Sequence, residues 1–270
     1  MLNDMKNGSS GSRFDHAVIV TAVRMDEAAE LFERLGFLLT PRGHHTLGSI
    51  NHLIVLGSTY IELLGLPADK PDARPELRDS PLGLDALVFR SDDADETSRA
   101  GLARGAPLGP VQRFSRPVAL GTGEGDAIFR TVRCLPGIAQ AGRLYFCEHL
   151  TPELVWQPEW QGHPNGAVEL VGAVVRVPDA AREAQLYAQL LGEQAVTKAS
   201  DGVQVQADPV CIRMIQSQAE PAMTSLSLRV RNLAQTEDFL LAAGFDIERN
   251  GQWIRVPAGQ AWNVELNFLA

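Results

Sequence analysis

The hydrophobic and polar positions from Phe14 to Leu64 predict a unit in which one strand and one helix precede three further strands. Residues 14–23 alternate and are rich in Val and Ile, which is typical of a half-buried strand. The next stretch carries apolar residues at helical spacing, namely Ala28, Leu31, Phe32 and Leu35. Gly36 then predicts the end of this helix, because glycine readily adopts the left-handed conformation of a C-cap. The three remaining strands are expected around residues 38–41, 50–56 and 60–64.

The same order of elements recurs along the chain. The clearest copy spans residues 169–216, another runs from Met223 to the C-terminus, and a looser one lies near residues 82–150. Four copies at uneven spacing are too few for a solenoid. Paired copies can instead join their sheets into one curved surface. We therefore predict an α+β fold in which repeated βαβββ units pair into two domains with curved mixed sheets.

Stretches rich in proline and glycine set the expected domain boundaries. Residues 1–12 contain Asn-Gly-Ser-Ser-Gly-Ser, which is typical of a flexible segment. Residues 13–150 form the expected first domain, with the candidate site, and residues 167–270 form a second, degenerate domain. The linker at 151–166 holds two Trp, which we expect to pack between the domains. Within the first domain, the charged and Pro-rich stretch 67–81 indicates a surface connection between two units.

Composition narrows the class of protein. The chain of 270 residues is 45% hydrophobic and 21% charged, as globular proteins are, and carries a formal net charge of -9. This acidic balance and the absence of a basic run argue against nucleic acid or an anionic membrane as a partner. No apolar run reaches the roughly 18 residues of a membrane span. The start of the sequence also lacks an apolar signal core.

Three widely spaced cysteines, Cys134, Cys147 and Cys211, include no CxxC pair. They predict reduced thiols in a cytoplasmic protein rather than a disulfide framework or a zinc cluster. The sequence GTGEG at 121–125 lacks the Lys-Ser/Thr of a phosphate-binding loop and opens no helix, so no nucleotide cofactor is expected. A small-molecule ligand is expected as the partner, with a homodimer left open as the assembly.

Polar residues with chemical potential gather in the first unit. It holds four of the six histidines: His16, His44, His45 and His52. Glu62 lies between apolar residues, so it should be buried and need a partner, which could be a metal, a histidine or an arginine. His16, on an apolar strand, is equally well interpreted as a hydrogen-bonded core histidine or as a ligand. The residues alone leave both alternatives open.

The repeated units resemble the vicinal oxygen chelate superfamily, and two segments are similar to a glyoxalase-like group within it. These segments are RGHHTLGSINHLIVLGSTYIELLG at 42–65 and FCEHLTPELVWQPEWQGHPNGA at 146–167. The superfamily includes glyoxalase I, extradiol dioxygenases, and fosfomycin-resistance and bleomycin-binding proteins. The resemblance therefore implies a fold but not one activity. It also implies a metal site that takes one ligand from the opening strand and one from the closing strand of each paired unit.

This resemblance implies His16 and Glu62 as metal ligands from the first unit. In the second unit, counting back from the helix-ending glycine gives Asp85 on the opening strand. The closing strand offers Glu148 or His149, and only one of these neighbours should face the cavity because side chains alternate along a strand. Such a set suits a divalent metal, whether Mn, Fe, Ni, Co or Zn.

The resemblance also implies roles for residues around the metal. Glu62 or Glu148 would move a proton, and Tyr60 would act as a general acid, although Tyr60 is equally well interpreted as a core aromatic. His45 and Asn51 are the expected substrate-binding residues, with His45 alternatively an exposed loop residue and Asn51 alternatively a turn-fixing residue.

Two classes of function follow. The first is a metal-dependent enzyme of the glyoxalase and dioxygenase superfamily, a lyase, isomerase or dioxygenase, that acts on a small oxygen-rich molecule. The alternative is a metal-free protein that binds or sequesters a small molecule in the same concave pocket.

The second domain is expected to be structural. The repeat places Gly172 and Arg213 where His16 and Glu62 stand, and the fourth unit offers only Thr224 or Ser225 and Glu265. These groups cannot hold a divalent cation, because a guanidinium repels it. Arg213 and Glu265 are expected to form a buried ion pair or an anion contact.

Overall fold

The computed structural model describes residues 11–120, 123–199 and 202–270. Most of the segment expected to be flexible, residues 1–10, lies outside these ranges, as do positions 121–122 of the glycine-rich loop.

The first sheet is built from two consecutive units. Its strands and helices are β1 (Phe14–Ala22), α1 (Met25–Arg34), β2 (Gly43–His44), β3 (Ile50–Leu56), β4 (Thr59–Gly65), α2 (Pro75–Arg78), β5 (Gly83–Ser91), α3 (Ala94–Ala103), β6 (Gln112–Leu120), β7 (Gly123–Arg133) and β8 (Arg143–His149). The strand order is β2-β3-β4-β1-β5-β8-β7-β6, so each unit forms half of the sheet and the opening strands β1 and β5 meet at its centre. β1 runs parallel to β4 and antiparallel to β5, which makes the sheet mixed.

The second sheet repeats this arrangement. It contains β9 (Ala167–Val177), α4 (Ala180–Leu191), β10 (Val196–Ala199), β11 (Gly202–Ala207), β12 (Val210–Gln216), β13 (Ala222–Val230), α5 (Leu233–Ala242), β14 (Glu248–Arg249), β15 (Trp253–Val256) and β16 (Glu265–Leu269). Its order, β10-β11-β12-β9-β13-β16-β15-β14, matches that of the first sheet strand for strand. The prediction of an α+β fold with paired βαβββ units is confirmed.

One predicted strand is absent where it was expected. Residues 38–41 are not a strand, and the short β2 lies instead at Gly43–His44. Thr40 does form a backbone hydrogen bond with Leu53. Pro41 interrupts the ladder at the next residue because it has no amide hydrogen to donate.

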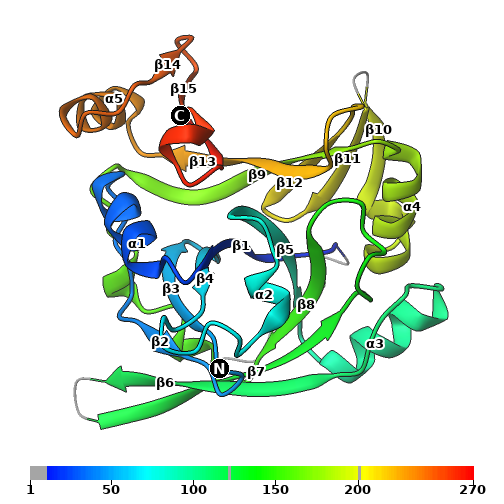
Figure 1. Ribbon diagram of the computed structural model, residues 1–270. Helices are drawn as coiled ribbons and strands as arrows, with labels where there is room; N and C mark the ends of the chain where they lie inside the picture. Colours follow the sequence, from blue (N-terminus) through cyan, green and yellow to red (C-terminus); the bar gives the residue numbers. More distant parts are fainter. Residues whose placement is uncertain (1–10, 121–122, 200–201) are drawn as a thin grey trace, which may run out of the picture.

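Two apolar clusters divide the interior. The larger one joins the outer face of the first sheet, the helices and the second sheet, for example where Phe37 stacks on Phe268 with ring centroids 6.3 Å apart. The smaller one lines the concave face of the first sheet. Alternation along β1 explains the division, since Ala17 and Ile19 enter the first cluster and Val18 and Val20 the second. The two sheets thus share one core (Figure 1).

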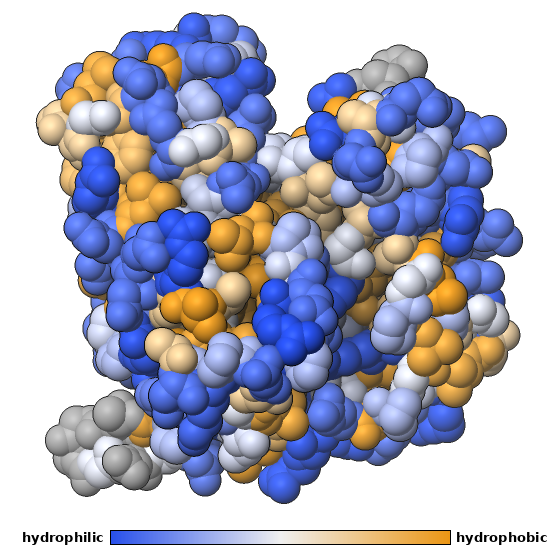
Figure 2. All heavy atoms as spheres, viewed as in Figure 1, coloured by the Kyte–Doolittle hydropathy of each residue, from blue (hydrophilic) through white to orange (hydrophobic). Residues whose placement is uncertain are grey.

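The concave faces of the two sheets differ in exposure. In the first, the long β6–β7 hairpin and α2 lie around the concave side (Figure 1). In the second, β9, β12 and β13 form the floor of a notch that is open to solvent between two prominences at the top of Figure 2. Arg213 on β12 is exposed there. An enclosed site is therefore found over the first sheet.

Two connecting segments close the first concave face. Leu77 of α2 is fully buried in the smaller cluster, so the stretch 67–81 is more than a surface connection. The linker forms the short turns η1 (Pro152–Leu154) and η2 (Pro158–Trp160). Its Trp156 was expected to pack between the domains. Its ring instead packs on His149, with ring centroids 4.7 Å apart.

No helix in the described parts of the chain is long and apolar enough to cross a membrane.

Candidate functional site

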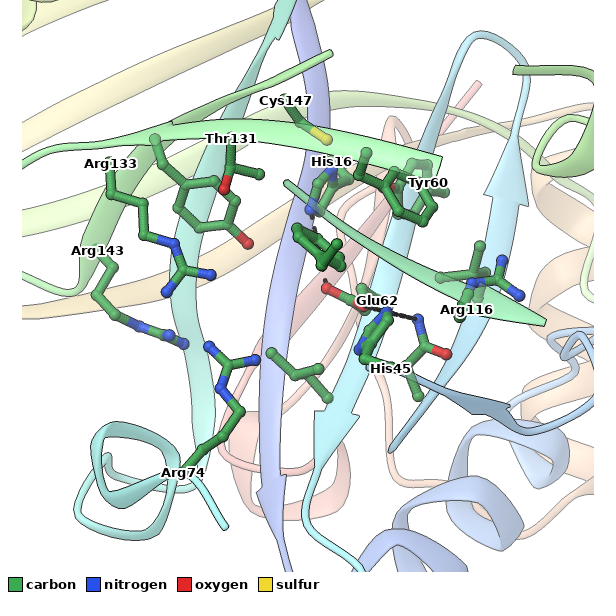
Figure 3. A pocket seen from close by; sticks show the side chains of 16 residues that line it. His16, His45, Tyr60, Glu62, Arg74, Arg116, Thr131, Arg133, Arg143 and Cys147 are labelled. Carbon is green, nitrogen blue, oxygen red and sulfur yellow. Dashed lines mark hydrogen bonds and ion pairs between the residues drawn. The ribbon is translucent and has the colours of Figure 1, made fainter. Parts of the chain in front are cut away.

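A cavity with about 520 Å³ of free space, counted out to its mouth, lies on the concave face of the first sheet. Its lining comes from β1, β3, β4, β6, β7 and β8 and from the loops beside them. Of the residues expected from the sequence, it brings together His16, His45, Asn51, Tyr60 and Glu62 (Figure 3). Alternation along β1 and β4 explains how His16, Tyr60 and Glu62 come to share this face.

His16 is held by its neighbour Asp15. The Nδ1 atom of His16 lies 2.7 Å from Oδ1 of Asp15, and both residues are buried. A register shift between Phe14 and His16 marks a bulge, which explains how adjacent side chains can meet on one side of the strand. Asp15 also accepts hydrogen bonds from His149 and Arg90.

The charge of Asp15 fixes the tautomer of His16. Burial alone would favour the neutral acid, but contacts with His149 and His16 hold the pKa of the Asp15 carboxyl well below its usual range. An ionised carboxylate only accepts hydrogen bonds, so Nδ1 of His16 must carry a proton. A neutral His16 then keeps its lone pair on Nε2, the atom that lies 3.8 Å from Glu62 Oε2.

Glu62 on β4 is the carboxylate of the cavity. Its Oε1 accepts a hydrogen bond of 2.7 Å from Nδ2 of Asn51 on the neighbouring strand β3, and lies 3.8 Å from Nε2 of His45. The pairing of Leu53 with Glu62 makes Asn51 the diagonal neighbour of Glu62 on the same face. Because only 7% of Glu62 is exposed, these partners offset a burial that would otherwise cost several kcal/mol, roughly.

His45 and Tyr60 complete the polar floor as neutral groups. Burial lowers the pKa of His45 to about 4, although Glu62 acts in the opposite direction. Tyr60 stacks on His16 with ring centroids 4.3 Å apart, and burial raises the pKa of its hydroxyl well above the usual value. At neutral pH both side chains are uncharged, so Glu62 is the anion of this floor.

Four arginines line the same cavity, and sequence reasoning missed them. Arg74, Arg133 and Arg143 lie together on one side of the view in Figure 3 and Arg116 on the other. A signal was present in β7, where Phe129, Thr131 and Arg133 occupy alternate positions and line the cavity together. Arginine side chains do not bind a metal ion, so the search for metal ligands did not predict these four residues.

Three expected site residues lie outside the cavity lining. Asp85 pairs with Arg143, with Nε 2.7 Å from Oδ2. Glu148 accepts a hydrogen bond from the backbone of Ala94 at the start of α3 and pairs with Arg130, so it serves the outer side of the sheet. His149 lies on the concave side with the aromatic rings of the smaller cluster, but its Nε2 is bound to Asp15.

A bulge explains why the repeat count selected Asp85. The pairing of β1 with β4 skips Thr21, whereas the pairing of β5 with β8 runs unbroken from Ala86 to Ser91. Counting back from the glycine is therefore off by one residue. Val18 opposes Glu62 in the first unit and Val88 opposes Tyr145 in the second, so the positions that match His16 and Glu62 are Ala86 and Tyr145.

The donor set tests the metal site implied by the resemblance. The second unit supplies an alanine and a neutral tyrosine, since burial raises the pKa of Tyr145. Elsewhere in the described chain, Asp15, Cys147 and His149 bring potential ligand atoms within 4.8 Å of one another. However, burial raises the pKa of the Cys147 thiol well above its usual value, and Asp15 is already saturated by three donors. These residues do not fit a four-ligand metal ring.

Among the described residues, the corresponding face of the second sheet carries no comparable set. Gly172 and Arg213 stand where expected, but Arg213 is exposed and Glu265 is half-buried, 3.5 Å from Arg255. The expected buried pair of Arg213 and Glu265 is therefore not formed.

Comparisons with known proteins agree with this architecture. The model of a family described as "Glyoxalase-like domain" matches residues 14–191. No curated protein matches. A hypothetical protein from Staphylococcus aureus is similar in structure over 95% of this chain and 98% of its own, with a TM-score of 0.72 and 10% identity.

Two enzymes are also similar in fold. A variant of 4-hydroxymandelate synthase from Streptomyces coelicolor has a TM-score of 0.55 and 12% identity over 96% of this chain and 92% of its own. The 2,3-dioxygenase LapB from Pseudomonas sp. KL28 has a TM-score of 0.57 and 14% identity over the same shares. At such identities the likeness describes the fold. The chain therefore belongs to the glyoxalase-like domain family of the vicinal oxygen chelate superfamily.

Proposed function

We propose that the chain is an enzyme that moves a proton on a small oxygen-rich molecule bound over the first sheet, with His16 as the base. The observation that carries this proposal is the row formed by Asp15, His16 and Glu62. A buried carboxylate holds one nitrogen of the imidazole at 2.7 Å, while the other nitrogen points at the cavity. This arrangement orients a base and stabilises the imidazolium that forms when it accepts a proton.

Each residue of the row has a separate role. Nε2 of His16 takes a proton from a carbon beside a carbonyl group, the electron pair of the broken C–H bond moves onto the carbonyl oxygen, and Asp15 stays ionised throughout. Glu62, held by Asn51, lies close enough to the same space to return or relay the proton. The guanidinium groups at the cavity wall stabilise the negative charge that develops on a substrate oxygen, because they are positive charges already held in place.

Metal-dependent catalysis is the second candidate. It is favoured by one observation, the 3.8 Å separation between His16 Nε2 and Glu62 Oε2, with Asp15 behind the histidine as in many metal sites. In the second unit, the positions that would supply the other two metal ligands hold Ala86 and Tyr145. Four guanidinium groups also face the cavity and would repel a cation, so the base mechanism fits the residues better.

The test is hydrogen exchange in heavy water. The protein, purified without chelator and assayed for bound metals, is incubated with small hydroxy and oxo compounds, both neutral and anionic, and the loss of C–H signals is followed by proton NMR. The proposal predicts exchange at one carbon of at least one compound, unchanged by added chelator. His16→Gln should reduce the rate by roughly 100-fold or more.

Three outcomes would contradict the proposal. Exchange that persists in His16→Gln removes this residue as the base. A stoichiometric divalent ion that is lost in His16→Ala, with activity that chelator abolishes, makes the metal-dependent enzyme the better account. Binding of a compound without any exchange makes the chain a binding or sequestering protein.

A further inference from the structure

The charges around Arg133 do not balance. Two of its neighbours are neutralised, since Arg74 lies 2.8 Å from Glu76 and Arg143 lies 2.7 Å from Asp85. Arg133 itself contacts the ring of Tyr145, 5.5 Å from its centroid, and has no acidic partner within the described residues. Its side chain nevertheless faces the cavity beside the other two guanidinium groups (Figure 3). This side of the cavity therefore carries an uncompensated positive charge.

Hydrogen-bond donors that line the same cavity also lack partners. Nε of Arg133, Nη2 of Arg143 and the hydroxyl of Thr131 are all shielded from solvent without an acceptor in the described chain. Thr131 is only 1% exposed, and it lies two residues before Arg133 on the same face of β7. Buried donors of this kind are costly unless an acceptor meets them. Three such donors from two strands indicate an acceptor with several oxygens.

The electrostatics agree with this geometry. Burial lowers the pKa of Arg133, and the positive charges of Arg74 and Arg143 act in the same direction, while Tyr145 and the carboxylate of Glu76 oppose them. A guanidinium in this position is destabilised when no anion binds to it. An anion at the same place would relieve both its desolvation and the repulsion from its neighbours.

We infer that the cavity takes a small organic anion, whose carboxylate or phosphate group is held by Arg133, Arg143 and Thr131 while the rest of the molecule extends toward His16 and Glu62. This inference names the substrate class of the proposed function and rests on it. Planar guanidinium groups bind carboxylate and phosphate through two hydrogen bonds at once, which neutral sugars or cations cannot match. The partly enclosed position of this cavity on the concave face of the first sheet limits the ligand to a small molecule.

The experiment titrates two probes, malonate and inorganic phosphate, against the whole chain by calorimetry. Arg133→Met removes the charge but keeps much of the apolar stem. Arg113→Met, on the exposed side of β6, is the matched control for a lost positive charge. The inference expects wild type and Arg113→Met to bind at least one probe with the same affinity, and Arg133→Met to bind it at least tenfold more weakly. Malonate alone would assign a carboxylate, and phosphate alone a phosphate group.

A stability readout separates ligand binding from a structural role. Without anion, Arg133→Met should unfold at the same temperature as wild type or higher, because a buried unpaired charge has been replaced by an apolar side chain. Unfolding at a clearly lower temperature would assign Arg133 to the fold and overturn the inference. So would the absence of binding by either probe, or equal affinity in Arg133→Met.

The result is independent of proton transfer. Binding that depends on Arg133, combined with no hydrogen exchange, leaves the anion site standing and refutes the enzyme. Hydrogen exchange that occurs only with neutral compounds would support the enzyme and refute the anion as its substrate.

Discussion

Asp15 and His45 show how burial sets protonation inside the cavity. Asp15 stays charged because three donors surround it, whereas His45 stays neutral because burial outweighs the attraction of Glu62. Nδ1 of His45 lies 2.9 Å from the hydroxyl of Ser49, and its Nε2 lies 3.3 Å from Nδ2 of Asn51. A charged imidazole at this position would approach Arg116 and Arg74, which also lower its pKa.

The depressed pKa of His45 predicts a pH-dependent loss of stability. In the unfolded chain this histidine takes up a proton below pH 6.5, but in the folded chain only near pH 4. The unfolded state therefore binds more protons between these values, and stability falls as the pH is lowered through this window. The contribution of His45 should be about 2–3 kcal/mol between pH 7 and pH 4.5.

Urea unfolding of wild type and His45→Gln at both pH values measures this contribution. The wild type should lose more stability than the variant by that amount, with His52 and His163 titrating equally in both proteins. A difference between the two proteins that does not change with pH would refute the assignment.

Residue-level prediction succeeded where alternation was regular and failed where it was not. His16, Tyr60 and Glu62 were expected at one site from the repeated units and the alternation along their strands, and Asn51 from the family resemblance, and the structure gathers them in the cavity. Asp85 was misplaced by the bulge at Thr21, which no pattern in a single sequence reveals. The arginines were missed for a different reason: their long side chains reach the cavity from β6, β7, β8 and the segment before α2, so the Cα position says little about where the charge lies.

At the scale of elements, the glycines that end the helices illustrate how repeated units diverge. Gly36 follows α1 with a φ of 82°, and Gly244 follows α5 with a φ of 81°. Both conformations favour glycine. A Cβ on Gly244 would meet nothing within 4 Å, but one on Gly36 would clash with the ring of Phe239 and lie 2.9 Å from Cβ of Asn165. In the first unit, the lack of a side chain at Gly36 therefore also allows α5 and the linker to pack closely against it.

Gly36→Ala and Gly244→Ala form a matched pair. Each should lose about 1–2 kcal/mol because alanine is strained in the left-handed region. Gly36→Ala should lose a further 1–3 kcal/mol, roughly, because the added methyl group overpacks the contact with α5 and the linker. Chemical denaturation of both variants measures the difference. Equal losses would show that the packing around Gly36 yields freely.

Strands and helices were predicted well because local patterns specify them. The contacts of the segments that connect them were not predicted. The strands expected around residues 50–56 and 60–64 match β3 and β4 to within one residue at each end, since apolar alternation and a glycine turn mark their ends. The linker at 151–166 was expected to separate two domains, yet His163 binds the backbone of Leu38 and Val55, and so ties it to the first sheet. A polar, Pro-rich stretch gives no sign of such long-range partners.

At the scale of the whole molecule, the repeat predicted the pairing of units but not the shared core. Apolar residues on the outer faces of both sheets were visible in the sequence, but their pattern does not say which surface they cover. In the structure they meet, as where Phe89 packs on Tyr187 across the two halves. The first sheet keeps an enclosed polar cavity, whereas the second leaves its concave face open. The enclosed polar cavity is therefore found in one half of a nearly symmetric molecule.

We propose His16 as a base that Asp15 holds in place, with one free ring nitrogen that faces the cavity. Nitrogen NMR of histidine-labelled protein tests it most directly, because the two ring nitrogens report separately on protonation and on metal binding. For neutral His16 we predict a proton on Nδ1 and a bare Nε2, a spectrum unchanged by chelator or by one equivalent of zinc, and mixed tautomers in Asp15→Asn. A proton on Nε2 of neutral His16, or a resonance of Nε2 that shifts on removal or addition of the metal, would contradict it.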